Sequence, residues 1–148
     1  MRSLHFVLGA ALLSACAKPD APPAAEPAPP AAAVNLADFA GTWTLQVMGE
    51  ASDSILVTNT IVASADPAAW TMTLPGRPPM ALRVSTSGDS VVTEAGPYES
   101  VLRPGVQVST RSAMKLEGGM MVGRTVAMYA GGGADSVRVL RTRGTRNP

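Results

Sequence analysis

Apolar and polar residues alternate along much of residues 41–143, and this period of two predicts β-strands. The clearest case is 106–116, where alternate positions carry Val106, Val108, Thr110, Ser112, Met114 and Leu116. The positions between them are mostly polar or charged. The segment 41–47 repeats the pattern with Trp43, Leu45 and Val47 on one face. Six more segments with this alternation or rich in β-branched residues lie at 55–63, 70–74, 80–84, 91–94, 120–129 and 136–143.

Short turn sequences such as Gly88-Asp89 and Gly118-Gly119 separate these segments, and none of them has the period of an amphipathic helix. Residues 35–40 are expected to form one helical turn capped by Asn35. Consecutive hairpins favour an up-and-down order of strands, and closure removes exposed strand edges. We therefore expect an all-β fold, an antiparallel up-and-down meander of about eight strands that closes into a small barrel.

The first 34 residues follow a different pattern. Arg2 precedes an apolar run from Leu4 to Leu13, which is shorter than the roughly 20 residues of a membrane-spanning helix. Residues 17–34 are rich in proline and alanine, which favours an extended spacer of about 3.1 Å per residue. We expect a signal peptide at 1–15, a tether at 16–34 and a folded domain at 35–148, with the first boundary placed before Cys16 by the resemblance described next.

The tetrad Leu13-Ser14-Ala15-Cys16 resembles the lipobox of bacterial lipoprotein signal peptides. This resemblance implies that residues 1–15 are removed and that Cys16 carries a lipid that anchors the chain in a membrane. Ala17, rather than Asp, follows the cysteine, which in that family implies the outer membrane. The expected location is the bacterial cell envelope, facing the periplasm, with exposure on the cell surface as the alternative.

Gly41-Thr42-Trp43 on the first strand of an eight-stranded meander resembles the lipocalin and avidin-like barrels, the calycin type. The resemblance implies a small barrel with Trp43 packed across its closed end. In lipocalins an arginine from near the last strand commonly covers this tryptophan. Arg138, Arg141 and Arg143 occupy that place in this sequence.

The composition excludes several kinds of chemistry. His5 is the only histidine and Cys16 the only cysteine, so the processed chain would have neither an imidazole nor a free thiol. Catalysis by His or Cys and zinc or haem ligation by these residues are then excluded. We expect no enzyme activity, no metal and no cofactor. The formal net charge of +1 is too small to indicate a nucleic-acid partner.

Methionine is frequent beside the predicted strands. Met72, Met80 and Met114 share faces with Leu74, Leu82 and Leu116, so they are the residues expected to face a small apolar ligand. The alternative is that they fill the core themselves. The segment around Tyr98, Glu99 and Arg103 is either the mouth of such a site or a solvated connector.

The predicted function is a membrane-anchored envelope lipoprotein whose barrel binds a small apolar ligand. The alternative is a structural or interaction lipoprotein with a filled core and no small-molecule ligand. An interior volume of several hundred Å³ would favour the first, and close packing would favour the second.

Overall fold

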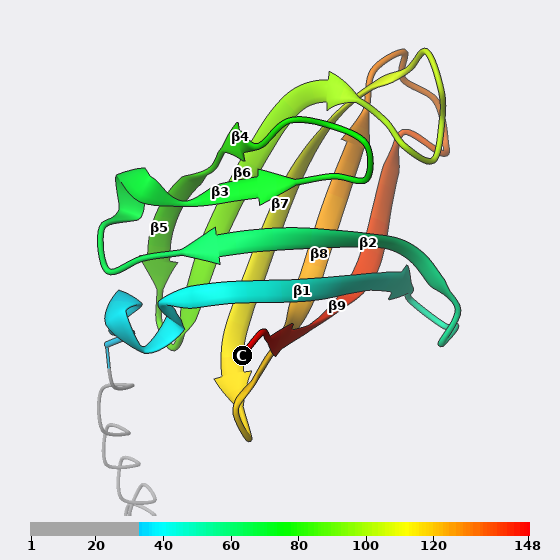
Figure 1. The fold of residues 1–148 in the computed structure, drawn as a ribbon. Coiled ribbons are helices and arrows are strands. Elements are labelled where there is room, and N and C mark those ends of the chain that lie inside the picture. The colour runs from blue at the N-terminus through cyan, green and yellow to red at the C-terminus, as the bar shows by residue number, and fades with distance from the viewer. Residues whose placement is uncertain (1–32) are drawn as a thin grey trace, which may run out of the picture.

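The computed structural model describes residues 33–148. The predicted signal peptide, Cys16 and nearly all of the tether lie outside the described residues. Figure 1 shows the described part as one strongly curved sheet. Among residues 33–148, no helix has both the length and the apolar character that crossing a membrane would require.

Nine antiparallel strands and two short 3-10 helices make up the fold. They are η1 (Leu36–Phe39), β1 (Gly41–Gly49), β2 (Ile55–Ala63), η2 (Pro67–Ala69), β3 (Thr71–Thr73), β4 (Met80–Ala81), β5 (Arg83–Ser87), β6 (Ser90–Glu99), β7 (Gln107–Glu117), β8 (Met120–Tyr129) and β9 (Val137–Arg146). The prediction of an all-β antiparallel meander is confirmed, and so is the turn capped by Asn35, whose side chain accepts a hydrogen bond from the Ala37 backbone at 3.1 Å.

The sheet forms a nearly closed barrel. Its order is β4-β3-β2-β1-β9-β8-β7-β6-β5, so the first long strand pairs with the last. The two edge strands, β4 and β5, are neighbours in the chain and are separated only by Leu82. β4 pairs with β3, whereas β5 pairs with β6. The sequence predicted one strand at 80–84. It is divided because the chain changes partners at Leu82, whose backbone N–H donates to Trp70 O at 2.9 Å.

Two strands extend beyond their predicted ends. β6 was expected to stop before Gly96-Pro97, but it continues to Glu99 through an irregularity between Ala95 and Tyr98. Gly96 makes this possible because its φ is +103°, and a Cβ there would lie 2.7 Å from Val108 O. β9 was expected to end at Arg143. It runs to Arg146 because its last residues pair with β1, where Arg146 lies opposite Trp43.

The chain enters the barrel beside the first residues of β1. Val34, predicted to be the end of the tether, is half-buried and packs against the main core. Leu36 also packs against that core, and Phe39 belongs to it. In Figure 1, η1 lies at the lower left, at the opposite side of the molecule from the loops that follow β6 and β8. The two ends of the barrel can therefore be told apart by their position relative to η1.

Candidate functional site

Large apolar side chains fill the end of the barrel next to η1. We call this cluster the plug; its members are Phe39, Trp43, Trp70, Val91, Met114 and Met121, all of them at most 3% exposed. The Trp43 indole N–H donates to Phe39 O at 2.7 Å, and that of Trp70 donates to Ser64 O at 2.7 Å. Both tryptophans are therefore buried without an unpaired donor, which is the condition under which they stabilise a core.

An arginine of the last strand covers Trp43, but it is none of the three that the sequence suggested. The guanidinium carbon of Arg146 lies 4.5 Å from the centre of the Trp43 ring. Arg146 also donates to Ala40 O at 2.5 Å and to Asp38 O at 2.7 Å. Arg138 and Arg143 are exposed. The assignment was wrong because the prediction ended the last strand three residues too early. Gly41 lies beside this contact: its φ is +132°, and the Arg146 side chain passes 3.5 Å from where a Cβ would be.

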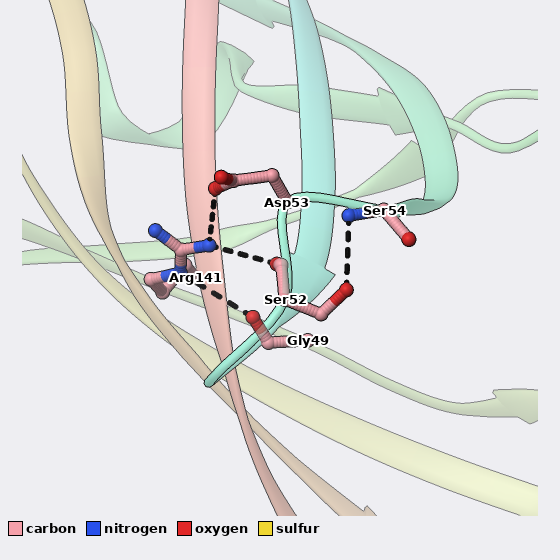
Figure 2. A network of polar contacts seen from close by, with 5 residues as sticks. All are labelled: Gly49, Ser52, Asp53, Ser54 and Arg141. Atoms are coloured by element: carbon pink, nitrogen blue, oxygen red, sulfur yellow. Dashed lines mark hydrogen bonds and ion pairs between the residues drawn. The ribbon is translucent and has the colours of Figure 1, made fainter.

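Arg141 has a different structural role, at the far end of β1 (Figure 2). Its guanidinium donates to Gly49 O at 3.3 Å, to Ser52 O at 2.7 Å and to a carboxylate oxygen of Asp53 at 2.7 Å. The hydrogen bond and the charge of Arg141 lower the pKa of Asp53 below its ordinary value. Arg141 thus ties the turn between β1 and β2 to β9 and is not a ligand-binding residue inside the barrel.

The other half of the barrel contains a cavity of about 70 Å³. One wall is mainly apolar and comes from β1, β2 and the segment around β3, with Val47, Val57, Met72 and Leu74 among its residues. The opposite wall comes from β6 to β9 and carries several hydroxyl groups. No Lys, Arg, Asp, Glu or His is found among the described residues that line the cavity. The volume is well below the several hundred Å³ that would have favoured a barrel that binds a small apolar ligand over a barrel with a filled core.

A row of four hydroxyl groups crosses the wall formed by β6 to β9, and three of them are linked by hydrogen bonds. We call it the hydroxyl row: Thr93, Ser112, Thr125 and Thr142. Ser112 Oγ and Thr125 Oγ1 are 2.7 Å apart, and Thr125 Oγ1 and Thr142 Oγ1 are also 2.7 Å apart. Thr93 lies opposite Ser112 in the register of β6 and β7. Register thus brings together hydroxyls that are far apart in the sequence.

Asn59 projects from β2 into the same cavity. Its side chain is 7% exposed, and its Oδ1 atom has no hydrogen-bond partner among the described residues. An unpaired buried acceptor of this kind is uncommon in folded proteins and costs about 1–3 kcal/mol. The prediction of a purely apolar ligand surface is therefore wrong for this cavity, because an amide and a row of hydroxyls share it with the aliphatic side chains.

Residues 100–105, which we call the cap, cover the cavity at the end away from the plug. Ser100 Oγ accepts hydrogen bonds from the backbone N–H groups of Leu102 and Arg103, at 3.1 and 3.0 Å. The guanidinium carbon of Arg103 lies 4.0 Å from the centre of the Tyr129 ring. Val101 and Leu102 of the cap line the cavity. Of the two interpretations of this segment, the contacts favour the mouth of the cavity over a solvated connector.

Tyr98 and Glu99, at the end of β6, directly precede the cap. Tyr98 is half-buried and lines the cavity, and this burial raises the pKa of its phenol. The carboxylate of Glu99 accepts a hydrogen bond from the Gly105 backbone at 3.0 Å. The Arg77 side chain donates to Glu99 O. Glu99 therefore connects the end of β6 both to the cap and to the loop after β3.

Only one of the three predicted methionines lines the cavity. Met72 does. Met114 belongs to the plug, and Met80 is half-buried against the core. The prediction was wrong for Met80 and Met114 because the alternation of residues shows which face is internal but not how far along the barrel a residue lies. The hydroxyl row was missed although Thr110 and Ser112 had been placed on the internal face of 106–116.

No family model matches the chain, and neither the curated proteins nor the solved structures include a significant match. The strand order shows an all-β barrel that is nearly closed and compatible with a lipocalin-like fold. It does not assign the chain to a particular family. Within residues 33–148, no three His, Cys, Asp or Glu side chains come together in a way that would hold a metal ion.

Proposed function

We propose that this chain is a lipid-anchored lipoprotein of the bacterial cell envelope, with a calycin-type barrel that binds a small, mainly apolar ligand beneath the cap. The observation that supports it is the cavity of about 70 Å³ between the plug and the cap. A barrel with a purely structural role would gain stability from side chains that filled this space, because each buried aliphatic group adds dispersion contacts.

The size of the cavity limits the ligand. A space of about 10–15 Å³ by this measure is needed to hold one water molecule, so the cavity has room for a few non-hydrogen atoms. Pockets for drug-sized molecules are larger, at roughly 300–1,000 Å³. The proposed ligand is therefore a small molecule of a few non-hydrogen atoms and not a long-chain lipid.

The position of the first described residues supports access from the aqueous side. Val34 and η1 pack at the plug end, whereas the cap lies at the other end of the barrel. A tether from Cys16 therefore joins the domain at its filled end. The cap is then at the end of the domain that is not attached to the anchor, so a ligand can reach the cavity from solvent.

Replacing each of two alanines by leucine, one inside the cavity and one outside it, tests ligand binding. Ala127 lines the cavity, and Ala113 is exposed on the outer face of the neighbouring strand. The full chain, labelled at its methyl groups, would be exposed to xenon at increasing pressure and followed by nuclear magnetic resonance. We expect saturable shifts at cavity methyls that Ala127→Leu abolishes and Ala113→Leu leaves unchanged. A folded wild-type chain without saturable shifts would favour the structural lipoprotein with a filled core.

The anchor is tested separately. Cys16→Ala should prevent lipidation and cleavage, because the lipobox of this class requires the cysteine thiol. Fractionation of cells and mass spectrometry of the purified chain would measure both effects. A wild-type chain that is free in solution and begins downstream of Cys16 would contradict the proposed membrane attachment.

A further inference from the structure

The cavity has a chemical polarity that the proposed function does not explain. We infer that its ligand is a small uncharged molecule with an O–H or N–H group, such as a short alcohol or a primary amide, and that this group donates to Asn59 Oδ1. The inference rests on the proposed ligand binding and deepens it by naming the class of ligand.

Asn59 is the first observation. On the internal face of β2 its neighbours are Val57 and Ile61, so an aliphatic residue would continue the pattern at this position. The strand carries instead an amide that is 7% exposed and whose oxygen has no partner among residues 33–148. An amide oxygen accepts hydrogen bonds and cannot donate them. A ligand donor would remove the cost of the unpaired acceptor.

The hydroxyl row is the second observation. Ser112, Thr125 and Thr142 carry three hydroxyl protons, and the two hydrogen bonds among them use two. These three hydroxyls therefore keep one proton to donate, and their oxygens keep lone pairs that accept; Thr93, the fourth member of the row, carries a further hydroxyl. A group that both donates and accepts, such as an alcohol or an amide, matches such a wall better than a group that only accepts.

The lack of charge is the third observation. None of the described residues lining the cavity is a Lys, Arg, Asp, Glu or His. A carboxylate, phosphate or ammonium group would lose its hydration there without gaining an opposite charge, which is strongly unfavourable. The aliphatic wall, with Val57, Met72 and Leu74, accommodates the apolar part of the ligand. The cavity therefore selects for neutral molecules.

A set of probes of similar size tests the inference on the full chain. 1-Propanol and propionamide donate a hydrogen bond, ethyl methyl ether accepts one without donating, and propionate and propylammonium are charged. Methyl shifts at Thr125 and Ala127 would report binding. We expect saturable binding of the alcohol and the amide, about tenfold weaker binding of the ether, and no binding of the ions.

The variant Asn59→Leu tests whether Asn59 Oδ1 accepts the hydrogen bond from the ligand. It should weaken binding of 1-propanol by about tenfold and remove the preference over the ether. Thr58→Val is the matched control, because Thr58 is exposed on the same strand. Thr58→Val should leave the affinities for 1-propanol and for ethyl methyl ether unchanged. The methyl shifts of Val91 in the plug report whether each variant is folded.

The failure of the inference can be distinguished from the failure of the proposed ligand binding. Equal affinity of the wild-type chain for the alcohol and the ether overturns the inference without any variant and leaves the proposed ligand binding intact. A preference for the alcohol that persists in folded Asn59→Leu overturns the role of Asn59. If none of the probes binds and xenon does not bind either, water alone occupies the cavity, and both proposals fail.

Discussion

The same strands build two very different halves of the barrel. On β1, Trp43 belongs to the plug, and Val47, four residues later, lines the cavity. On β8, Met121 is in the plug, whereas Thr125 is in the hydroxyl row. Large apolar side chains thus give way to smaller ones and to hydroxyls over a distance of four residues along each strand. The comparison indicates that stability and the candidate site are separated along the axis of the barrel.

The physical basis of this separation is the number of partner atoms. A plug side chain is surrounded on all sides, so it gains hydrophobic free energy and dispersion contacts, about 1.5–3 kcal/mol for a fully buried side chain. A residue beside the cavity lacks contacts on one side. The cavity half therefore contributes less to stability.

The largest effect is expected in the plug. Trp43→Ala should lower the free energy of unfolding by about 3–5 kcal/mol, because Trp43 has no exposed surface and its removal leaves a void. Denaturant titration followed by circular dichroism would measure it. A loss below about 1 kcal/mol, typical of surface positions, would show that the plug is not the stabilising half.

A smaller loss in the free energy of unfolding is expected on replacing Arg146, which covers the plug. Arg146→Met should cost about 1 kcal/mol, because it removes the contact of the guanidinium with the Trp43 ring and two hydrogen bonds at an exposed site. Arg143→Met on the same strand is the control, with a change within about 0.5 kcal/mol. Equal losses in the two variants would refute the assignment of Arg146.

The cavity half should respond to alkaline pH through Tyr98. Burial raises the pKa of this phenol above its ordinary value of 10.0, so the unfolded chain ionises first. The contribution of Tyr98 to the free energy of unfolding should be fully present well below pH 10 and be lost as the pH rises through the folded pKa. Tyr98→Phe should reduce this fall, as measured by denaturant titrations between pH 8 and about 11.5. An unchanged alkaline profile in the variant would place the sensitive group elsewhere.

The smallest effect on stability is expected at Asn59. Asn59→Leu removes the unpaired acceptor, so the free energy of unfolding without added ligand should stay the same or rise by up to about 1 kcal/mol. Thermal unfolding of the wild-type chain and the variant would compare them. A loss of more than about 1 kcal/mol would mean that the amide supports the fold, and the contrast between the plug and the cavity would then weaken.

Much of the fold could be predicted because strand periodicity is local. The alternation in 41–47 and 106–116 and the turns at Gly88-Asp89 and Gly118-Gly119 led to the correct strand order. The strand boundaries that were predicted wrongly all depend on pairing between strands. The division at Leu82, the continuation of β6 past Gly96 and the extra residues of β9 depend on which strand lies alongside. A partner strand is not visible in a local pattern, and it can extend a strand beyond a glycine or a proline.

The candidate site was less predictable for the same reason. The sequence by itself determined which residues face inward, because side chains alternate across a strand. Thr125, Met114 and Met72 are all internal in that sense. Only the tertiary structure decided that Met114 fills the plug, that Met72 borders the cavity, and that Thr125 bonds to Ser112 and Thr142. The height of a residue along a barrel depends on the stagger between neighbouring strands, and that stagger exists only once the strands have paired.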